Sequence, residues 1–156
     1  MAGRMTAAVL TGHGGPEVLV VRDDVPVPAP SAGEVLVQVT AAAVNNTDIW
    51  TRQGAYGRAE DPDAVVGWQG VPLDFPRIQG GDVVGIIVAV GAEVDDALTG
   101  RRVLIDPTTY DGDGDEPTLT AVLGSEHDGG FAEYVVVAAD RAHDVTDAPL
   151  SDAQLA

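Results

Sequence analysis

The stretch Gly80-Gly81-Asp82-Val83-Val84-Gly85-Ile86-Ile87-Val88-Ala89-Val90-Gly91 is the strongest indication of the fold in this chain. It is an apolar run, rich in β-branched residues, that is entered and left through glycines. A run of this kind favours a buried β-strand, and each flanking glycine permits a tight turn or a close approach of the backbone. We therefore expect a buried strand over residues 83–90.

Short strand signals, each bounded by turn residues, flank this segment on both sides. We expect strands over residues 6–11, 17–22, 34–43, 103–106 and 131–138, with a shorter one near His143. Residues 45–52 predict a short helix, which Asn45 or Asn46 can cap through its side-chain oxygen. Residues 54–76 and 108–130 are rich in turn-forming or acidic residues, and we expect both to be irregular. Many short strands separated by turns favour a closed barrel or a sandwich over a parallel sheet.

The composition narrows the class of protein further. The chain has 156 residues, of which 45% are hydrophobic, and this is enough for one folded domain. It carries 25 acidic residues against 8 basic residues, all arginine, so its net charge of −17 disfavours nucleic acid and anionic membranes as partners. Either a general compositional bias or adaptation to high salt explains this charge, and neither bears on a reaction. The absence of cysteine excludes disulfides, thiol nucleophiles and thiolate metal sites.

The sequence also bears on location. No apolar run reaches the length needed to span a bilayer. The opening residues 1–5 lack the apolar core of a signal peptide. We therefore expect a cytoplasmic location and no membrane partner.

Several segments resemble, in the right order, the medium-chain dehydrogenase/reductase superfamily. The glycine-bounded strand is similar to its Gly-His-Glu-x-x-Gly segment, and Ala43-Val44-Asn45-Asn46-Thr47-Asp48 is similar to the start of its active-site helix. The other matching segments are Gly14-Gly15-Pro16-Glu17-Val18-Leu19, which looks like the quinone-oxidoreductase branch, residues 28–37, Gly100-Arg101-Arg102-Val103 and residues 129–135. The resemblance implies a mainly β fold, a GroES-like partly open β-barrel with short helices.

The same resemblance implies a domain organisation. Residues 1–150 would form the GroES-like catalytic domain, and residues 151–156, with Ser151 as the cap, would begin the interdomain helix. Members of the superfamily continue into a Rossmann domain with a glycine-rich phosphate turn. This chain has no strand–GxGxxG–helix unit, because Gly12-x-Gly14-Gly15 lacks the following helix whose N-terminus binds pyrophosphate. We therefore expect the Rossmann domain to be absent and the chain to be a fragment of a longer enzyme.

The resemblance also bears on metal. In zinc-dependent members, a Cys at the position of Asn45 and a His at the position of Gly81 bind the catalytic zinc, and Asp82 stands where those members carry Glu. Catalytic zinc generally needs three protein ligands of the His, Cys or carboxylate type. The two replacements and the absence of cysteine therefore predict neither a catalytic nor a structural zinc.

In the zinc-independent quinone-oxidoreductase branch, the positions of Asn45 and Trp50 line the nicotinamide and substrate pocket. The resemblance implies that Asn45 donates its amide to a carbonyl oxygen and stabilises developing enolate charge, while Thr47 is a hydroxyl donor or proton relay. Asn46, Asp48 and Trp50 complete the expected binding set, with Trp50 as an apolar wall where the branch carries Tyr. The residues alone leave other interpretations open: Asn45 as a helix cap only, Asp48 as a loop tie, and Trp50 as core.

Two further segments have alternative interpretations. His127, between Glu126 and Asp128, is a candidate base or ligand, although a solvated loop is the simpler interpretation. The oxygen-rich residues 111–116 suit a hard cation such as calcium. Their spacing departs from the EF-hand pattern, so a flexible acidic loop and weak cation binding both remain open.

Together these features predict the catalytic-domain fragment of a zinc-independent NADPH-dependent oxidoreductase. It would transfer hydride to a small quinone, enone or other carbonyl substrate, and we expect the isolated fragment to be inactive. The alternatives are a stand-alone, non-catalytic GroES-like binding module and a zinc-type alcohol dehydrogenase with altered ligands. We also expect self-association, because truncation exposes the apolar domain face that the cofactor domain normally covers.

Overall fold

The computed structural model describes residues 3–111 and 117–156. Within these residues the chain is mainly β, as the sequence predicted, with two α-helices and three 3₁₀ helices. The strands are β1 (Arg4–Leu10), β2 (Leu19–Pro26), β3 (Glu34–Ala43), β4 (Arg77–Ile78), β5 (Asp82–Val90), β6 (Arg102–Ile105), β7 (Thr108–Asp111), β8 (Thr118–Val122), β9 (Tyr134–Ala138) and β10 (Ala142–Asp144). The helices are α1 (Asn46–Gln53), α2 (Asp152–Leu155), η1 (Pro16–Val18), η2 (Asp96–Leu98) and η3 (Ala139–Arg141).

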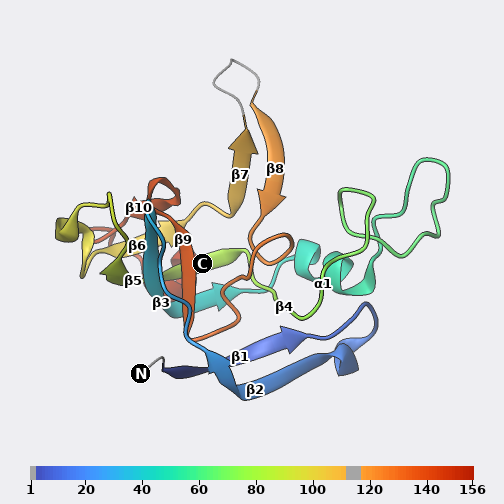
Figure 1. Ribbon diagram of the computed structural model, residues 1–156, viewed down its shortest axis with the longest axis horizontal. Helices are drawn as coiled ribbons and strands as arrows, with labels where there is room; N and C mark the ends of the chain where they lie inside the picture. The colour runs from blue at the N-terminus through green and yellow to red at the C-terminus, as the bar shows by residue number, and fades with distance from the viewer. Residues whose placement is uncertain (1–2, 112–116) are drawn as a thin grey trace.

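The strands form three antiparallel sheets (Figure 1). The largest has the order β10-β6-β5-β3-β9, the second has the order β2-β1-β4, and β7 and β8 make a separate hairpin that projects from the body. Backbone hydrogen bonds join the first two sheets just before β9, where Ala8 N donates to Phe131 O over 2.8 Å and Glu133 N donates to Thr6 O over 3.1 Å. The two sheets therefore curve into a partly open barrel.

The core is centred on the neighbouring strands β3 and β5. Val35 and Val37 of β3 and Ile87 of β5 are almost fully buried, because alternate side chains of a strand point to the same face. Position 85 requires glycine, since a Cβ atom there would lie 2.3 Å from Gln38 O on β3. The glycine-bounded apolar run thus forms the buried strand that its pattern predicted.

Several segments differ from the expectation: the strand expected over residues 17–22 is preceded by η1 and runs over residues 19–26, and the one expected over residues 131–138 begins at Tyr134. Residues 108–130 are not irregular throughout, because β7 and β8 pair as a hairpin with Thr108 opposite Val122. The β-branched residues of these strands favour extended backbone, but the acidic stretch between them dominates the local pattern. The two-residue strand β4, which pairs with the end of β1, was also not predicted from the sequence. The expected cation-binding segment 111–116 lies outside the described residues except for Asp111.

The segment after β10 packs back against β6 through one arginine. Arg102 donates from Nη2 to Leu150 O over 2.7 Å and from Nε to Asp152 Oδ1 over 2.6 Å. α2 begins after Ser151, whose backbone N donates to Gln154 Oε1 over 3.0 Å. The helix start thus lies where the sequence predicted it, whereas the expected domain boundary at residue 150 stays a prediction.

Both α-helices are short, with 8 residues in α1 and 4 in α2. In the described part of the chain, no helix combines the length and the apolar character that crossing a membrane requires. The expected cytoplasmic location stays a prediction.

Candidate substrate and cofactor site

The candidate site is built at the N-terminus of α1, which follows the central strand β3. Asn45 is the N-cap residue, and its Oδ1 accepts a hydrogen bond from Thr47 N over 3.4 Å. The backbone N of Asn45 in turn donates to Asp48 Oδ2 over 2.8 Å. This reciprocal capping box satisfies amides that the first turn of a helix leaves free. The geometry therefore gives Asn45 the capping role that the sequence left open as one alternative.

Asp48 fastens α1 to the glycine turn that precedes β5. Its Oδ1 accepts from Gly80 N over 3.1 Å, and its backbone O accepts from Gln79 Nε2 over 2.9 Å. Only 8% of Asp48 is exposed. Burial raises the pKa of its carboxyl above the ordinary value, hydrogen bonds from the backbones of Asn45 and Gly80 oppose that rise, and the charge of Asp82 adds to it. This geometry fits the interpretation of Asp48 as a tie between two segments.

Asp82 reaches the same site from β5. Ala43, at the end of β3, lies opposite Asp82 in the antiparallel register. The residues that follow β3 therefore lie beside the start of β5, and Asn45 Nδ2 donates to Asp82 Oδ2 over 3.1 Å. The sequence did not predict this pairing, because the register of β3 on β5 is the signal that reveals it, and a register is not visible in one sequence.

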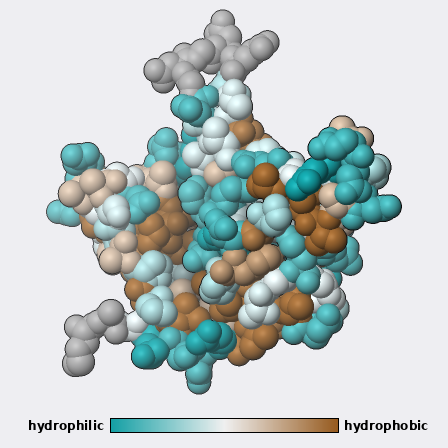
Figure 2. Space-filling view, turned by 45° about the vertical axis from the view of Figure 1, so that its right-hand side comes forward, coloured by the Kyte–Doolittle hydropathy of each residue, from teal (hydrophilic) through white to brown (hydrophobic). Residues whose placement is uncertain are grey.

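The outer face of α1 is open to solvent. Asn46 and Thr47 are exposed in its first turn, and Trp50 is 49% exposed. The ring of Trp50 meets that of Tyr56 edge-on, with 6.0 Å between centroids, so Trp50 is not a core residue. Figure 2 shows hydrophobic areas among hydrophilic ones on the side of the molecule that carries α1 and residues 54–76. Ile49, Val65 and Val71 of these segments, and Val44 just before α1, are also exposed.

The side chains at this site do not fit zinc. Both carboxylate oxygens of Asp48 already accept backbone N–H groups, and Asp82 is engaged with Asn45. Gly81 offers no donor atom from a side chain. Among residues 3–111 and 117–156, no three His, Cys, Asp or Glu residues are placed to hold a metal ion. Catalytic zinc generally needs such a set of ligands.

The loop after β8 is held by Glu126 rather than by its histidine neighbour. Glu126 Oε2 accepts from Trp68 Nε1 over 3.0 Å and from Val122 N over 2.9 Å. These bonds tie residues 54–76 to the end of β8. His127 and Asp128 are exposed, but Asp128 Oδ1 accepts from Ile78 N over 2.9 Å, so this segment is also tied to β4.

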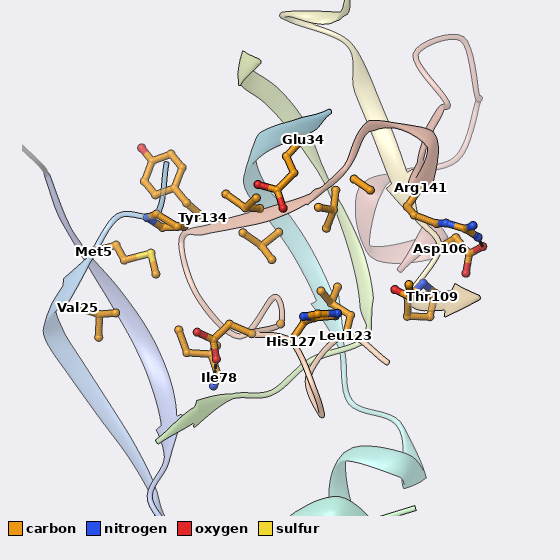
Figure 3. Close-up of a pocket in the computed structure, with 18 of the residues that line it drawn as sticks. Met5, Val25, Glu34, Ile78, Asp106, Thr109, Leu123, His127, Tyr134 and Arg141 are labelled. Atoms are coloured by element: carbon orange, nitrogen blue, oxygen red, sulfur yellow. Dashed lines mark hydrogen bonds and ion pairs between the residues drawn. The ribbon is translucent and has the colours of Figure 1, made fainter. Parts of the chain in front are cut away.

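A separate hollow of about 390 Å³ lies between the two larger sheets (Figure 3). Met5, Ile78 and Leu123 supply part of its apolar lining, and the ion pair of Arg141 with Asp106, 3.0 Å long, stands at one side. None of the candidate residues on α1 lines it. The hollow and the candidate site on α1 are therefore different places, although His127, which the sequence offered as a candidate base or ligand, lines the hollow.

The fold and the Asn-x-Thr-Asp helix start define a GroES-like domain of the medium-chain dehydrogenase/reductase class. The sequence profile of the alcohol dehydrogenase GroES-like domain matches residues 31–147, and the chain belongs to that family. The resemblance inferred from the sequence is thereby confirmed, together with the GroES-like fold.

Three similar proteins extend well beyond this chain. The crystal structure of a candidate alcohol dehydrogenase from Sinorhizobium meliloti 1021 is 51% identical, with a TM-score of 0.93, and the match covers 99% of this chain and 43% of that one. The crystal structure of the alcohol dehydrogenase RspB from Escherichia coli CFT073, in complex with NADH, is 30% identical, with a TM-score of 0.74, over 96% of this chain and 40% of that one. Quinone oxidoreductase from Homo sapiens is 33% identical over 134 residues, which are 86% of this chain and 31% of the relative.

The chain thus spans about a third of the length of the curated relatives it matches. Its fold is the GroES-like barrel, and residues 3–111 and 117–156 contain no Rossmann domain, as the sequence predicted.

Proposed function

We propose that this chain is the catalytic GroES-like part of a zinc-independent, NADPH-dependent oxidoreductase that reduces small quinones, enones or related carbonyl compounds. The observation that carries the proposal is the N-terminus of α1, where the exposed carboxamide of Asn45 is held by Asp82 in a setting that does not fit zinc. Family membership supports oxidoreductase chemistry, since the similar proteins include a quinone oxidoreductase and alcohol dehydrogenases. The NADH bound by one of them supports a nicotinamide cofactor, and the preference for NADPH follows the quinone-oxidoreductase resemblance of residues 14–19.

The nicotinamide cofactor supplies the hydride when it is bound. The N–H of Asn45 Nδ2 that Asp82 does not use donates to the substrate oxygen while negative charge develops there. Thr47, exposed in the same turn, offers a hydroxyl that donates to that oxygen or relays a proton. Trp50 lies one turn further along and forms an apolar wall for a flat substrate, while Asn46 is exposed for polar contact with the cofactor.

The same contacts bear on the two alternative functions, a zinc-type alcohol dehydrogenase and a non-catalytic binding module. A zinc-type alcohol dehydrogenase with altered ligands is disfavoured, because the carboxylates of Asp48 and Asp82 are already engaged. A non-catalytic binding module is also disfavoured, because such a module requires no hydrogen-bond donor directed at a substrate oxygen. Since the chain spans about a third of its curated relatives, we assign the activity to the complete polypeptide and expect the isolated chain to be inactive.

The test uses the complete polypeptide that carries this chain, assayed with NADPH or NADH and a soluble benzoquinone. Asn45→Ala is expected to lower kcat by about 100-fold, the effect of removing one donor to a developing oxyanion. Gln38→Ala is the matched control, because it truncates an exposed carboxamide on β3. Unchanged turnover in Asn45→Ala would refute the proposed role. If the complete polypeptide oxidises no nicotinamide cofactor, the binding module becomes the better account. Turnover by the isolated chain would contradict its expected inactivity.

A further inference from the structure

The carboxamide of Asn45 is oriented by two different neighbours. Its Oδ1 accepts from Thr47 N, and its Nδ2 donates to Asp82 Oδ2. A flipped carboxamide would place its oxygen against the carboxylate and its NH₂ group against a backbone N–H, so both contacts would become repulsive. Only one orientation of the Asn45 side chain therefore satisfies its surroundings, and Asp82 is the neighbour that selects the direction of the NH₂ group.

The two carboxylates at this site hold different parts of Asn45. Asp48 accepts from the backbone N of Asn45 and thereby fixes where α1 begins. Asp82 accepts only from the side chain, and its own place is fixed by the pairing of Ala43 with Asp82 across β3 and β5. Removal of the Asp82 carboxylate therefore leaves the helix cap intact and frees the direction of the side-chain NH₂ group.

We propose that Asp82 is a positioning residue, which aims the second N–H of Asn45 Nδ2 at the substrate oxygen by accepting the first. This proposal rests on the proposed function, because it assigns a partner to the donor of that same site. The carboxylate also places negative charge near an oxygen that itself becomes negative. The useful contribution of Asp82 is therefore the acceptor atom rather than the charge, and asparagine at position 82 should supply it equally well.

The first arm of the test measures the side chain of Asn45 in this chain without any substrate. Side-chain ¹⁵N relaxation is compared for the wild type, Asp82→Ala, Asp82→Asn and the control Asp23→Ala, which removes an exposed carboxylate on β2. We expect the Asn45 NH₂ group to be ordered in the wild type, in Asp82→Asn and in the control. In Asp82→Ala its order parameter should fall below about 0.6, the range of flexible groups, while the backbone amides of α1 keep their shifts. An Asn45 side chain that stays equally ordered in Asp82→Ala overturns the proposal.

The second arm measures turnover of the complete polypeptide with NADPH and benzoquinone. Misdirecting a donor costs less than deleting it, so Asp82→Ala should lower kcat by about 10-fold, against about 100-fold for Asn45→Ala. KM should stay within about twofold, because the donor acts on charge that develops after binding. Asp82→Asn should restore kcat to within about threefold of the wild type.

The two arms separate this inference from the function on which it rests. If Asn45→Ala lowers kcat but Asp82→Ala does not, the positioning role is wrong and the proposed function stands. If the complete polypeptide oxidises no nicotinamide cofactor, the proposed function fails, and the order of the Asn45 side chain still shows whether Asp82 orients it. If Asn45→Ala has no effect on kcat, the donor role of Asn45 fails, and with it the positioning role of Asp82. A loss of kcat in Asp82→Asn as large as that in Asp82→Ala also contradicts the inference, because the charge would then be the required feature.

Discussion

Arg102 on β6 reaches across to Asp152 at the start of α2, with 2.6 Å between Nε and Oδ1. The same guanidinium donates to the backbone oxygens of Leu150 and Ala148 over 2.7 and 3.3 Å. One side chain thus holds the path of the chain between β10 and α2.

Replacing Arg102 by methionine should release this segment. Because the Arg102 side chain is only 19% exposed and its bonds involve a charged donor, we expect a loss of about 2 kcal/mol in the free energy of unfolding. Arg101→Met is the matched control, since the neighbouring Arg101 makes an exposed ion pair with Asp144 and should cost less. Urea denaturation gives the stabilities, and amide hydrogen exchange in α2 shows whether the loss is local. Equal losses in both variants would show that Arg102 has no special role.

A methyl group at Gly80 should be far more harmful than one at Gly100. Both glycines have positive φ, 102° and 86° respectively, so alanine is strained at either place. At Gly100 the added Cβ meets open space, whereas at Gly80 it would lie 2.9 Å from Phe131 N. We expect Gly100→Ala to cost about 1 kcal/mol and Gly80→Ala more than about 3 kcal/mol. Thermal and urea denaturation of the two variants measure the difference, which disappears if the Gly80 turn can move away from Phe131.

The contribution of Asp48 to the free energy of unfolding should decrease as the pH rises. Burial raises the pKa of its carboxyl in the folded chain above the ordinary value, so the folded state binds the proton more tightly than the unfolded state does. This contribution is therefore fully present below the unfolded pKa and is lost as the pH rises through the folded pKa. Asp106 and Asp152 have lowered pKa values and act in the opposite direction.

The difference between the wild type and Asp48→Asn isolates the contribution of Asp48. The variant should be less stable throughout, because asparagine offers one acceptor oxygen to two N–H groups, but the gap should narrow with rising pH. Urea denaturation across the acid-to-neutral range, together with carboxyl ¹³C titration, measures both effects. A gap that widens with rising pH would contradict the raised pKa.

The purified chain should not retain zinc. The carboxylates of Asp48 and Asp82 are engaged, and Asn45 is itself a donor to one of them. After equilibration with zinc and dialysis, elemental analysis should find well under one zinc per chain. Stoichiometric zinc would revive the interpretation as an alcohol dehydrogenase with altered ligands.

The isolated chain should associate with itself through the exposed apolar side chains around α1. Trp50, Ile49 and Val44 contribute to that face, and contiguous exposed apolar surface promotes association. Sedimentation velocity over a range of concentrations should show a reversible dimer or larger species, which Trp50→Ser weakens. Val21→Ser is the control, because Val21 is an exposed apolar residue on β2 instead. A monomer at all concentrations would contradict the expectation.

The fold was predictable where the pattern is local. β3 runs from Glu34 to Ala43 as expected, because alternating valines and a preceding turn define both of its ends. The hairpin of β7 and β8 was not expected, since its strands are short and the acidic residues between them indicate a loop. β4 has two residues, too few for any periodicity, and it exists only because β1 offers it a partner.

The candidate site, like the fold, was predictable in its local contacts and not in those between distant segments. A helix cap at Asn45 or Asn46 was predicted, because a cap is a contact within one turn, whereas the part of Asp48 in that capping box was not. The contact of Asn45 with Asp82 depends on how two distant strands are aligned, and it appears only when the sheet is assembled. The exposure of Trp50 was also open, because an aromatic residue on a short helix suits a core and a binding wall equally well.

The register of β3 on β5 brings Asn45 and Asp82 together without help from residues 54–76, which lie between them in the sequence. Ala43 faces Asp82 at the edge of the sheet, while residues 54–76 leave α1 and return to β4 without taking part in the Asn45–Asp82 bond. Apart from its buried Val66 and the Trp68 bond to Glu126, the exposed residues of this segment should therefore tolerate substitution while the Asn45–Asp82 bond stays in place. Exposed positions of residues 54–76 are therefore the places to substitute when the aim is to change which molecules bind, because the alignment of β3 with β5 does not depend on them.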